Sequence, residues 1–226
     1  MNPDNIISLK IAWWNINKRL YLLANPDVLD TSPFADKNFD IVFIFETNLG
    51  YSCTPKINNY TCFSNPKKAV VKHGGIAAYV KNDLAKNLMD IKYNNSYLSF
   101  RLDHSSNTLF AGIYVQPKSS KYFNISLFSE IDALLKDCKE HNFTPLIGGD
   151  FNARIGDINM ISPWKYEKNC DSTTNKHGRL FFTDLCRHNK VYPLNHLISS
   201  NKTYHGDFTY IKANKKSQID FILTIV

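Results

Sequence analysis

The residues that most constrain the fold are 146–154, Leu-Ile-Gly-Gly-Asp-Phe-Asn-Ala-Arg. Their apolar start predicts a buried strand, which we expect to stop at the two glycines, where the backbone can approach another group closely. Asp150 and Asn152 are two residues apart, so on an extended chain both side chains would lie on the same face. Ligands of α/β folds bind at the carboxyl ends of strands. The alternative is an Asx turn, which favours the same residue types.

Length and charge narrow the class of protein. The 226 residues are enough for one domain with a large core, and we predict a single domain over residues 1–226. The net charge of +7 suits a polyanionic partner, although a basic surface also aids solubility. The five cysteines form no CxxC pair, which argues against a disulfide framework or a zinc site and for a reducing, intracellular setting. No apolar run approaches the roughly 20 residues that span a bilayer, and no secretory signal is seen.

The chain alternates between strand and helix patterns, which predicts a compact α/β fold. A polar segment over residues 156–174 is longer than most loops, which points to a functional role. Before the buried strand that begins near Leu146, we predict strands over residues 6–15, 40–46, 60–63 and 74–80, and an antiparallel pair over 92–102 and 108–115. After it we predict an extended segment over 191–195 and a last pair over 203–211 and 217–226, with helices over 19–25, 124–141 and 178–188.

Polar side chains stand where these strands end. Glu46 follows five apolar residues and belongs either to a helix cap or to a site, of which we favour the site. Asp220 lies inside an apolar strand, where a carboxylate is costly unless it is paired or bound to metal. Oxygen ligands without His or Cys suit Mg²⁺, and a metal with a positioned carboxylate base can hydrolyse a phosphoester. The set comprises Asn15, Glu46, Tyr114, Asp150, Asn152 and Asp220, with Thr209 nearby.

Short motifs, in order along the chain, resemble the endonuclease/exonuclease/phosphatase superfamily, which includes the apurinic endonucleases and DNase I. They are Trp14-Asn15-Ile16-Asn17, Phe45-Glu46-Thr47, Gly74-Gly75-Ile76-Ala77, Ile113-Tyr114, Gly149-Asp150-Phe151-Asn152-Ala153, Phe208-Thr209 and Ser217-Gln218-Ile219-Asp220. A second set looks like the endonuclease domain of non-LTR (LINE-type) retrotransposon polyproteins. It comprises Gly-Asp-Phe-Asn-Ala-Arg-Ile-Gly from Gly149, Asn175-Lys-His-Gly178, the helix to Cys186, and Leu194-Asn195.

The resemblance implies a four-layer α/β sandwich, two packed and mostly antiparallel sheets with helices outside. It also implies a role for each site residue. Glu46 would hold Mg²⁺, or alternatively Mn²⁺, with Asn15 assisting. Asp150 would align or deprotonate the attacking water, Asn152 would orient the phosphate, and Tyr114 would touch it. The supporting residues would be Asp220, Thr209 and Ser217, together with Lys67 and Lys68, which could equally belong to a solvated edge.

The resemblance further implies a setting for the reaction. The substrate would be DNA, nicked to leave the 3′ hydroxyl that primes reverse transcription. The partner would be a reverse transcriptase domain in the same parent polyprotein, acting in the nucleus. We expect a monomer without a membrane association.

One superfamily motif does not occur in the sequence, the final strand that carries Ser-Asp-His. None of the seven histidines follows a Ser-Asp pair, so we expect a chain truncated before its His-bearing strand. Loss of a group that stabilises phosphate charge costs about a hundred- to a thousandfold in rate, and this chain is expected to be weak or inactive.

Two other functions stay open. One is another branch of the superfamily, an apurinic repair nuclease or a phosphatase, which the segment 175–178 disfavours. The other is a catalytically silent remnant that binds nucleic acid through its basic residues and predicts salt-sensitive binding without nicking. These residues are Lys67, Lys68, Lys72, Lys212, Lys215 and Lys216.

Overall fold

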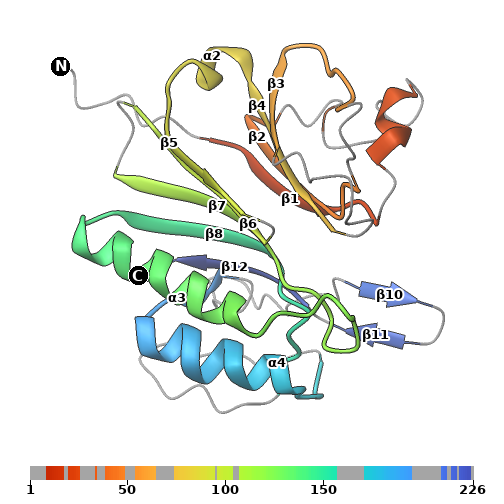
Figure 1. Cartoon of the computed structure of the whole chain (residues 1–226), viewed down its shortest axis with the longest axis vertical. Coiled ribbons are helices and arrows are strands. Elements are labelled where there is room, and N and C mark those ends of the chain that lie inside the picture. Colours follow the sequence, from red (N-terminus) through yellow and green to blue (C-terminus); the bar gives the residue numbers. More distant parts are fainter. Residues whose placement is uncertain are drawn as a thin grey trace, which may run out of the picture. The chain divides into compact units, whose positions relative to one another are not determined.

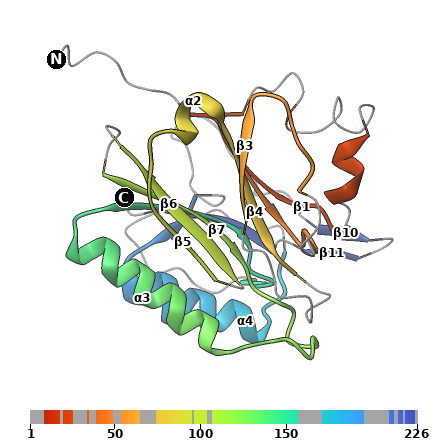
Figure 2. The same ribbon diagram turned by 45° about the horizontal axis from the view of Figure 1, so that its top comes forward.

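The computed structural model, shown in Figures 1 and 2, describes most of the chain. It covers residues 9–17, 20–25, 34, 39–48, 54–64, 74–94, 96–103, 107–156, 171–194, 210–212, 215–217 and 219–224. The chain divides into two units, Met1–Tyr114 and Val115–Val226, and each has its own arrangement of strands and helices. The predictions for residues 6–8 and 203–209, and for Lys67, Lys68, Lys72 and Thr209, fall outside the described residues.

The first unit contains a four-stranded sheet with the order β1-β2-β4-β3, in which β1 runs parallel to β2 and the other pairs are antiparallel. All five residues of β2 are buried, as its apolar sequence predicts. The other predicted strands of this region are confirmed, except that the first begins at Ile11, and its predicted residues 6–8 lie outside the described part of the chain. The bounds are β1 Ile11–Asn15, β2 Ile41–Phe45, β3 Tyr60–Ser64 and β4 Ile76–Lys81.

Three further strands of the first unit are antiparallel neighbours: β5 Leu88–Tyr93, β6 Tyr97–Leu102 and β7 Thr108–Tyr114. The prediction of one strand over residues 92–102 is wrong, because the chain turns at Asn94. The Oδ1 atom of Asn94 accepts hydrogen bonds from the backbone N–H groups of Ser96 and Tyr97, both at 2.8 Å. Such an Asx turn is a strong local competitor of an extended strand.

Aromatic residues join these two groups of strands within the first unit. Phe43 stacks on Phe100 with ring centroids 5.5 Å apart, and the Trp13 Nε1 donates a hydrogen bond to the Ala111 carbonyl at 3.1 Å. A Cβ atom at Gly112 would lie 2.5 Å from the Phe43 ring, so this strand position requires glycine. Burial of one such aromatic ring stabilises the fold by about 1.5–3 kcal/mol, which makes this layer a principal source of stability.

Two short helices complete the first unit. The predicted helix over residues 19–25 is a 3-10 helix, η1 (Leu20–Ala24), which buries Leu20 and Leu23 in a cluster with Tyr79 of β4. The helix α2 (Asn82–Ala85) directly follows β4 and has no buried residue. The first unit therefore has helical cover on one sheet and a second sheet packed against the other face.

In the second unit, the buried strand predicted from Leu146 is β8 (Thr144–Asp150), which pairs antiparallel with β12 (Asp220–Thr224). The expectation that β8 stops at the glycines is wrong, because pairing with Ile222 and Phe221 carries the strand through both glycines to Asp150. A cross-strand aromatic neighbour supplies the packing that a strand glycine lacks. The short strand β9 (Tyr192–Pro193), within the predicted extended segment, pairs with the other edge of β12.

The prediction that the last two strands, over residues 203–211 and 217–226, pair with each other is wrong. The strands β10 (Tyr210–Lys212) and β11 (Lys215–Ser217) pair with each other in a small hairpin. The apolar residues that follow form β12, with alternating buried and partly buried side chains, and pair with β8 and β9. Burial of Phe221 and Leu223 decides this pairing, because a strand adjacent to β8 can place both in the core.

Helices cover the β8–β12 pair in the second unit. The predicted helix over residues 124–141 is confirmed as α3 (Ser126–Glu140), and the one over 178–188 as α4 (Lys176–Arg179) continued by the π-helical η2 (Leu180–Arg187). Figures 1 and 2 show α3 and this second helix side by side. The Phe181 ring of η2 lies 4.7 Å from Phe151 and 4.8 Å from Phe221, centroid to centroid.

Mostly antiparallel sheets with helices packed on them define an α/β sandwich, the fold class that the resemblance implied. Among the described helices, none has the length and apolarity needed to cross a membrane. The cysteines in the described ranges, Cys62, Cys138 and Cys186, are free thiols.

Candidate active site

The first polar group that the sequence singled out assembles around Glu46 in the first unit. The Oε1 atom of Glu46 accepts hydrogen bonds from the Asn15 Nδ2 at 3.2 Å and from the Tyr114 hydroxyl at 2.8 Å. Asn15 is the last residue of β1 and Tyr114 the last of β7, while Glu46 directly follows β2. Three strand ends thus bring an amide, a carboxylate and a phenol together, as the sequence predicts.

The backbone at Glu46 is held in an unusual conformation. Its φ is +54°, in the left-handed region that few residues other than glycine adopt. The following residues bind the glycine pair before β4, with Thr47 N donating to the Gly75 carbonyl at 3.3 Å and Asn48 N to the Gly74 carbonyl at 2.9 Å. A Cβ atom at Gly75 would lie 2.5 Å from the Thr47 Oγ1, so the glycine permits this close approach.

The donor set of the Glu46 group fits a hard cation. A carboxylate and a nearby amide are the ligand types that Mg²⁺ takes, and Mg²⁺ keeps several waters and needs few carboxylates. The Asn15 Oδ1 accepts the backbone N–H of Asn17 at 2.8 Å, which fixes the direction of its side chain. Within the described ranges, no group of three or more His, Cys, Asp or Glu residues is placed to hold a metal. The Glu46 carboxylate and the Asn15 side chain are the groups that would hold a metal here.

The second polar group is the turn at the end of β8. Asp150 is 3% exposed, and its Oδ1 accepts the backbone N–H of Asn152 at 2.9 Å. Asn152 has a φ of +46°, so the chain is not extended here and the expectation that both side chains share one strand face is wrong. The Asx turn, the alternative interpretation of the sequence, is the observed structure. It is nevertheless the conformation that turns the Asn152 side chain out of the strand.

Val115, the residue directly after β7, is hydrogen-bonded to this turn. Its backbone N–H donates to the Asp150 carbonyl at 2.8 Å, and its carbonyl accepts the Asn152 Nδ2 at 2.8 Å. The Oδ1 and the second amide hydrogen of Asn152 have no partner among the residues that the structure describes. The orientation of the Asn152 amide is thus set by its hydrogen bond to the Val115 carbonyl.

Asp220 lies directly opposite Asp150 in the β8–β12 pairing. The backbone N–H of Phe151 donates to the Ile219 carbonyl at 3.0 Å, which holds the two strand ends together beyond the regular pairing. Like charges at facing positions repel, so two carboxylates at this register favour a nearby cation or a shared proton.

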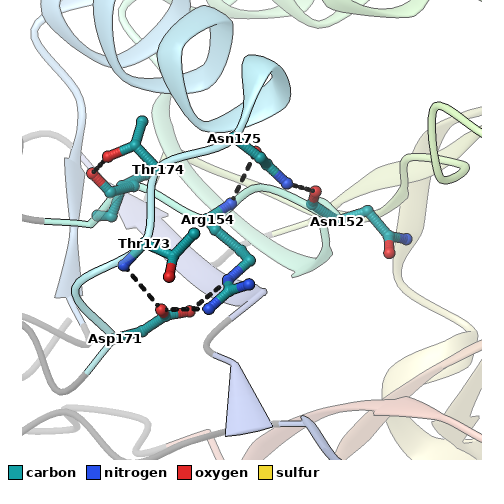
Figure 3. A network of polar contacts seen from close by, with 7 residues as sticks. Asn152, Arg154, Asp171, Thr173, Thr174 and Asn175 are labelled. Carbon is teal, nitrogen blue, oxygen red and sulfur yellow. Dashed lines mark hydrogen bonds and ion pairs between the residues drawn. The ribbon is translucent and has the colours of Figure 1, made fainter. Parts of the chain in front are cut away.

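A network of hydrogen bonds that the sequence did not predict supports the turn that carries Asn152. Arg154 binds Asp171 with two hydrogen bonds, Nε to Oδ2 at 2.8 Å and an amino nitrogen to Oδ1 at 2.7 Å (Figure 3). The Asp171 side chain is only 2% exposed, and its hydrogen bonds raise the pKa of Arg154 above the ordinary value. Arg154 stood in a quoted motif, but the Asp171 that it binds lies 17 residues away in a polar segment without periodicity.

Asn175 connects this network to the turn. Its Oδ1 accepts the backbone N–H groups of Arg154 at 3.0 Å and of Gly178 at 2.6 Å, and its Nδ2 donates to the Asn152 carbonyl at 3.0 Å. Figure 3 shows the Asn152 side chain directed away from this network, while its carbonyl faces Asn175. Asn175 therefore caps α4 and anchors the turn with the same side chain.

The remaining predicted site residues are placed only in part. Ser217 ends β11 in the small hairpin. Thr209, Lys67 and Lys68 lie outside the described residues. Their predicted supporting roles stay predictions.

The comparisons with known proteins bear on the fold. No family model and no curated protein matches the sequence. Among solved structures, the AP endonuclease LMAP from Leishmania major matches with a TM-score of 0.69 and 15% identity over 96% of this chain and 79% of that one. The 3′ phosphatase NExo from Neisseria matches with a TM-score of 0.64 and 16% identity, over 96% and 87%.

A third match is the catalytic domain of APE2 from Xenopus laevis, with a TM-score of 0.58 and 13% identity over 96% of this chain and 82% of that one. These neighbours share the endonuclease/exonuclease/phosphatase fold, and this chain has that fold as well. The particular likeness to LINE-type retrotransposon proteins rests on the sequence motifs.

Proposed function

We propose that this chain is a divalent-metal-dependent phosphodiester hydrolase that nicks DNA, the endonuclease of a non-LTR retrotransposon. The observation that carries the proposal is the Glu46 group, in which side chains from three strand ends hold one carboxylate in a fixed position. The left-handed backbone of Glu46 costs about 1–3 kcal/mol and is held by the hydrogen bonds of the next two residues to the glycine pair before β4.

The chemistry assigns one task to each group. Glu46, assisted by Asn15, would hold Mg²⁺, which supplies charge neutralisation at the phosphate oxygens when it is bound. Asp150 would align the attacking water and accept its proton, a role that suits a carboxylate fixed by a turn. Asn152 would orient the phosphate with its remaining amide hydrogen, and the Tyr114 hydroxyl would contact the same group. Asp220 would support Asp150 from the facing strand position.

DNA is the substrate that the similar proteins favour. The Neisseria phosphatase was solved with a product DNA hairpin, and the TDP2 of D. rerio, with a TM-score of 0.54 and 12% identity, with a single-stranded DNA product. The net charge of +7 is consistent with a polyanionic partner. The retrotransposon role, with a reverse transcriptase domain as partner and the nucleus as its place, derives from the sequence motifs around Asp150 and over residues 175–178.

A second candidate is a repair nuclease or a phosphatase. It is favoured by the neighbours themselves, since one is an AP endonuclease and another a 3′ phosphatase. The third possibility is a remnant that binds nucleic acid without cleaving it. It depends on six lysines, of which Lys67, Lys68 and Lys72 lie outside the described ranges.

Nicking of supercoiled plasmid tests the proposal. We expect weak nicking, with slow formation of relaxed circles in Mg²⁺ and none in EDTA, because the sequence lacks the Ser-Asp-His motif. Asp150→Asn keeps an Oδ1 that accepts the Asn152 N–H but removes the charge, so nicking should fall at least about a hundredfold. Asp83→Asn is the matched control, because the Asp83 side chain is 98% exposed on α2. Equal nicking by Asp150→Asn and wild type would refute the site assignment.

Two further substrates separate the candidates. Preference for an oligonucleotide with an abasic site over intact plasmid would favour the repair nuclease. Release of phosphate from inositol phosphates or from a 3′-phosphorylated oligonucleotide would favour a phosphatase. Salt-sensitive binding with no cleavage of any substrate would favour the silent remnant.

A further inference from the structure

Asn175 makes more hydrogen bonds than its position at the start of α4 requires. Its Oδ1 accepts the backbone N–H of Gly178 at 2.6 Å, which caps the helix. An aspartate has the same shape and would cap a helix equally well. Asn175 differs from it by the Nδ2 group, which donates to the Asn152 carbonyl at 3.0 Å, a bond that an ionised carboxylate cannot make. Capping alone therefore does not account for the amide.

The other bonds of Asn175 lie on both sides of Ala153. Its Oδ1 also accepts the backbone N–H of Arg154 at 3.0 Å, and its own backbone N–H donates to the Arg154 carbonyl at 2.9 Å. Because Oδ1 faces two N–H donors and Nδ2 faces a carbonyl, one orientation of the amide satisfies all these partners (Figure 3). The peptide groups before and after the buried Ala153 are thus both held by one residue.

We propose that Asn175 is a positioning residue, which holds the Asn152 amide in the direction needed to orient the phosphate. The inference rests on the proposed function of Asn152. The carbonyl of Asn152 is held by Asn175, and its backbone N–H by the Asp150 Oδ1 at 2.9 Å. Hydrogen bonds on both sides of this residue therefore maintain its left-handed φ of +46°, a conformation that costs about 1 kcal/mol or more.

The direction of the Asn152 amide depends on this backbone conformation. From it, the Asn152 Nδ2 donates to the Val115 carbonyl at 2.8 Å. Gly178 permits the contact between α4 and the turn, because a Cβ atom there would lie 1.8 Å from the Arg154 carbonyl oxygen. The motif Asn175-Lys-His-Gly178, which the proposed chemistry leaves without a role, accordingly supplies both the amide and the close approach.

Asn175→Asp removes the bond to the Asn152 carbonyl and keeps the cap. We expect kcat for nicking to fall about 10- to 100-fold with KM little changed, since small displacements of a positioned group cost rates of this size. Asn189→Asp is the matched control, measured at a temperature at which all variants are folded. Asn189 also donates from Nδ2 to a backbone carbonyl, that of Leu185 at 3.0 Å, and the loss of this bond should leave kcat unchanged.

The pH dependence of kcat distinguishes the lost donor from a loss of structure. Acid protonates the new carboxylate of Asn175→Asp, which can then donate to the Asn152 carbonyl, so the ratio of its kcat to that of wild type should rise from pH 8 to pH 5.5. Asn175→Ser keeps a shorter capping oxygen without a charge, so its kcat should be low at both pH values. The same pH dependence in both variants, or full kcat in either, would overturn the proposal.

A double substitution tests whether the effect passes through Asn152. In an Asn152→Ala background, Asn175→Asp should lower kcat no further, because the group that it positions is already absent. Effects of the two substitutions that multiply would overturn the proposal. A loss of kcat in both Asn175 variants that follows their thermal stability would do the same, as it would indicate a structural role.

Nuclear magnetic resonance provides a readout that does not depend on nicking. Nitrogen relaxation should show a rigid Asn152 side-chain amide in wild type and in Asn189→Asp, and a lower order parameter for this amide in Asn175→Asp. An unchanged order parameter in Asn175→Asp would overturn the inference even in an active enzyme. If the wild type nicks no substrate while the order parameters change as expected, the proposed function fails and the positioning of Asn152 by Asn175 stands.

Discussion

At the scale of single residues, the two polar groups of the candidate site share a backbone feature. Glu46 and Asn152 both follow a strand and both have a positive φ, +54° and +46°. Such conformations cost about 1 kcal/mol or more and persist where neighbouring contacts hold them. Asn15 and Tyr114 hold the Glu46 side chain, and Val115 with Asn175 holds Asn152.

The Arg154–Asp171 pair should be the most important ion pair of the described residues for stability. Arg154→Met leaves the Asp171 carboxylate, 2% exposed, without its guanidinium partner, and should lower the free energy of unfolding by about 3–5 kcal/mol. Arg101→Met is the matched control, since its partner Asp90 is 49% exposed and the loss should stay within about 1 kcal/mol. Urea unfolding of the two variants measures both values, and equal losses would contradict the prediction.

His177 should make the protein sensitive to acid. Burial lowers its pKa in the folded protein below the ordinary 6.5, so below that pH the unfolded chain binds a proton that the folded protein does not. The contribution of His177 to stability is therefore complete above pH 6.5 and declines as the pH falls toward the lowered pKa.

The measurement is the difference in unfolding free energy between wild type and His177→Phe, followed from pH 7.5 to pH 5. Other titrating groups largely cancel in this difference. Wild type should lose stability relative to the variant as the solution becomes acidic. A constant difference over this range would contradict a lowered pKa.

At the scale of elements, the short helix α4 connects the long polar segment to the turn that carries Asn152. The four residues of α4 could not form an independent helix, and it exists because Asn175 caps it and η2 continues it. Its first turn rests against the Arg154 backbone, and Thr174 closes the polar segment through a bridge to Ile155 with a hydrogen bond of 3.1 Å from Oγ1 to the Ile155 carbonyl. The element therefore joins the two ends of the long loop to the turn that carries Asn152.

Gly178→Ala tests this contact. In an ordinary helix the change to alanine would stabilise by up to about 1 kcal/mol. Here the new Cβ would lie 1.8 Å from a backbone oxygen of Arg154, so we expect a loss of about 1–3 kcal/mol in urea unfolding. Lys176→Ala, in the same helical turn with an exposed side chain, should change stability by less than about 0.5 kcal/mol. A stabilising Gly178→Ala would show that the helix does not approach Arg154 in this way.

At the scale of the whole molecule, a bound ion should stabilise the folded chain against global unfolding. If about 10 mM Mg²⁺ is about ten times its Kd, binding adds about 1.4 kcal/mol. For a chain of this length that corresponds to a rise in Tm of roughly 3–6 °C. Glu46→Gln preserves the shape of the side chain but removes the charge, so this shift should vanish in thermal melts of the variant. An equal shift in both proteins would place the ion elsewhere.

The net charge of +7 predicts how nucleic-acid binding responds to salt. Each phosphate that the protein neutralises on duplex DNA adds about −0.9 to the slope of log K against log salt. Even two such contacts would weaken binding about tenfold between 50 and 200 mM salt. Fluorescence anisotropy with the Asp150→Asn variant measures this without cleavage. Binding that does not change with salt would contradict an electrostatic interface.

Local patterns in the sequence determined the elements whose burial depends on near neighbours. The apolar run of β2 and the three- and four-residue spacing of α3 identified a buried strand and an amphipathic helix. The polar residues after strands also identified Asn15, Glu46 and Tyr114 as a group, because strand ends lie at a sheet rim whichever strand pairs with which. Sequence alone therefore determined the fold class and the residue types of the candidate site.

The tertiary structure decided what depends on distant partners. Asp220 faces Asp150 because β12 pairs with β8 to bury Phe221 and Leu223, a choice that no local pattern records. Asp171 is paired only because the chain returns to Arg154 after a long polar segment. Local propensity describes the preference of one segment, whereas pairing and buried polar contacts depend on the free energy of segments far apart in the chain, which only the folded arrangement brings together.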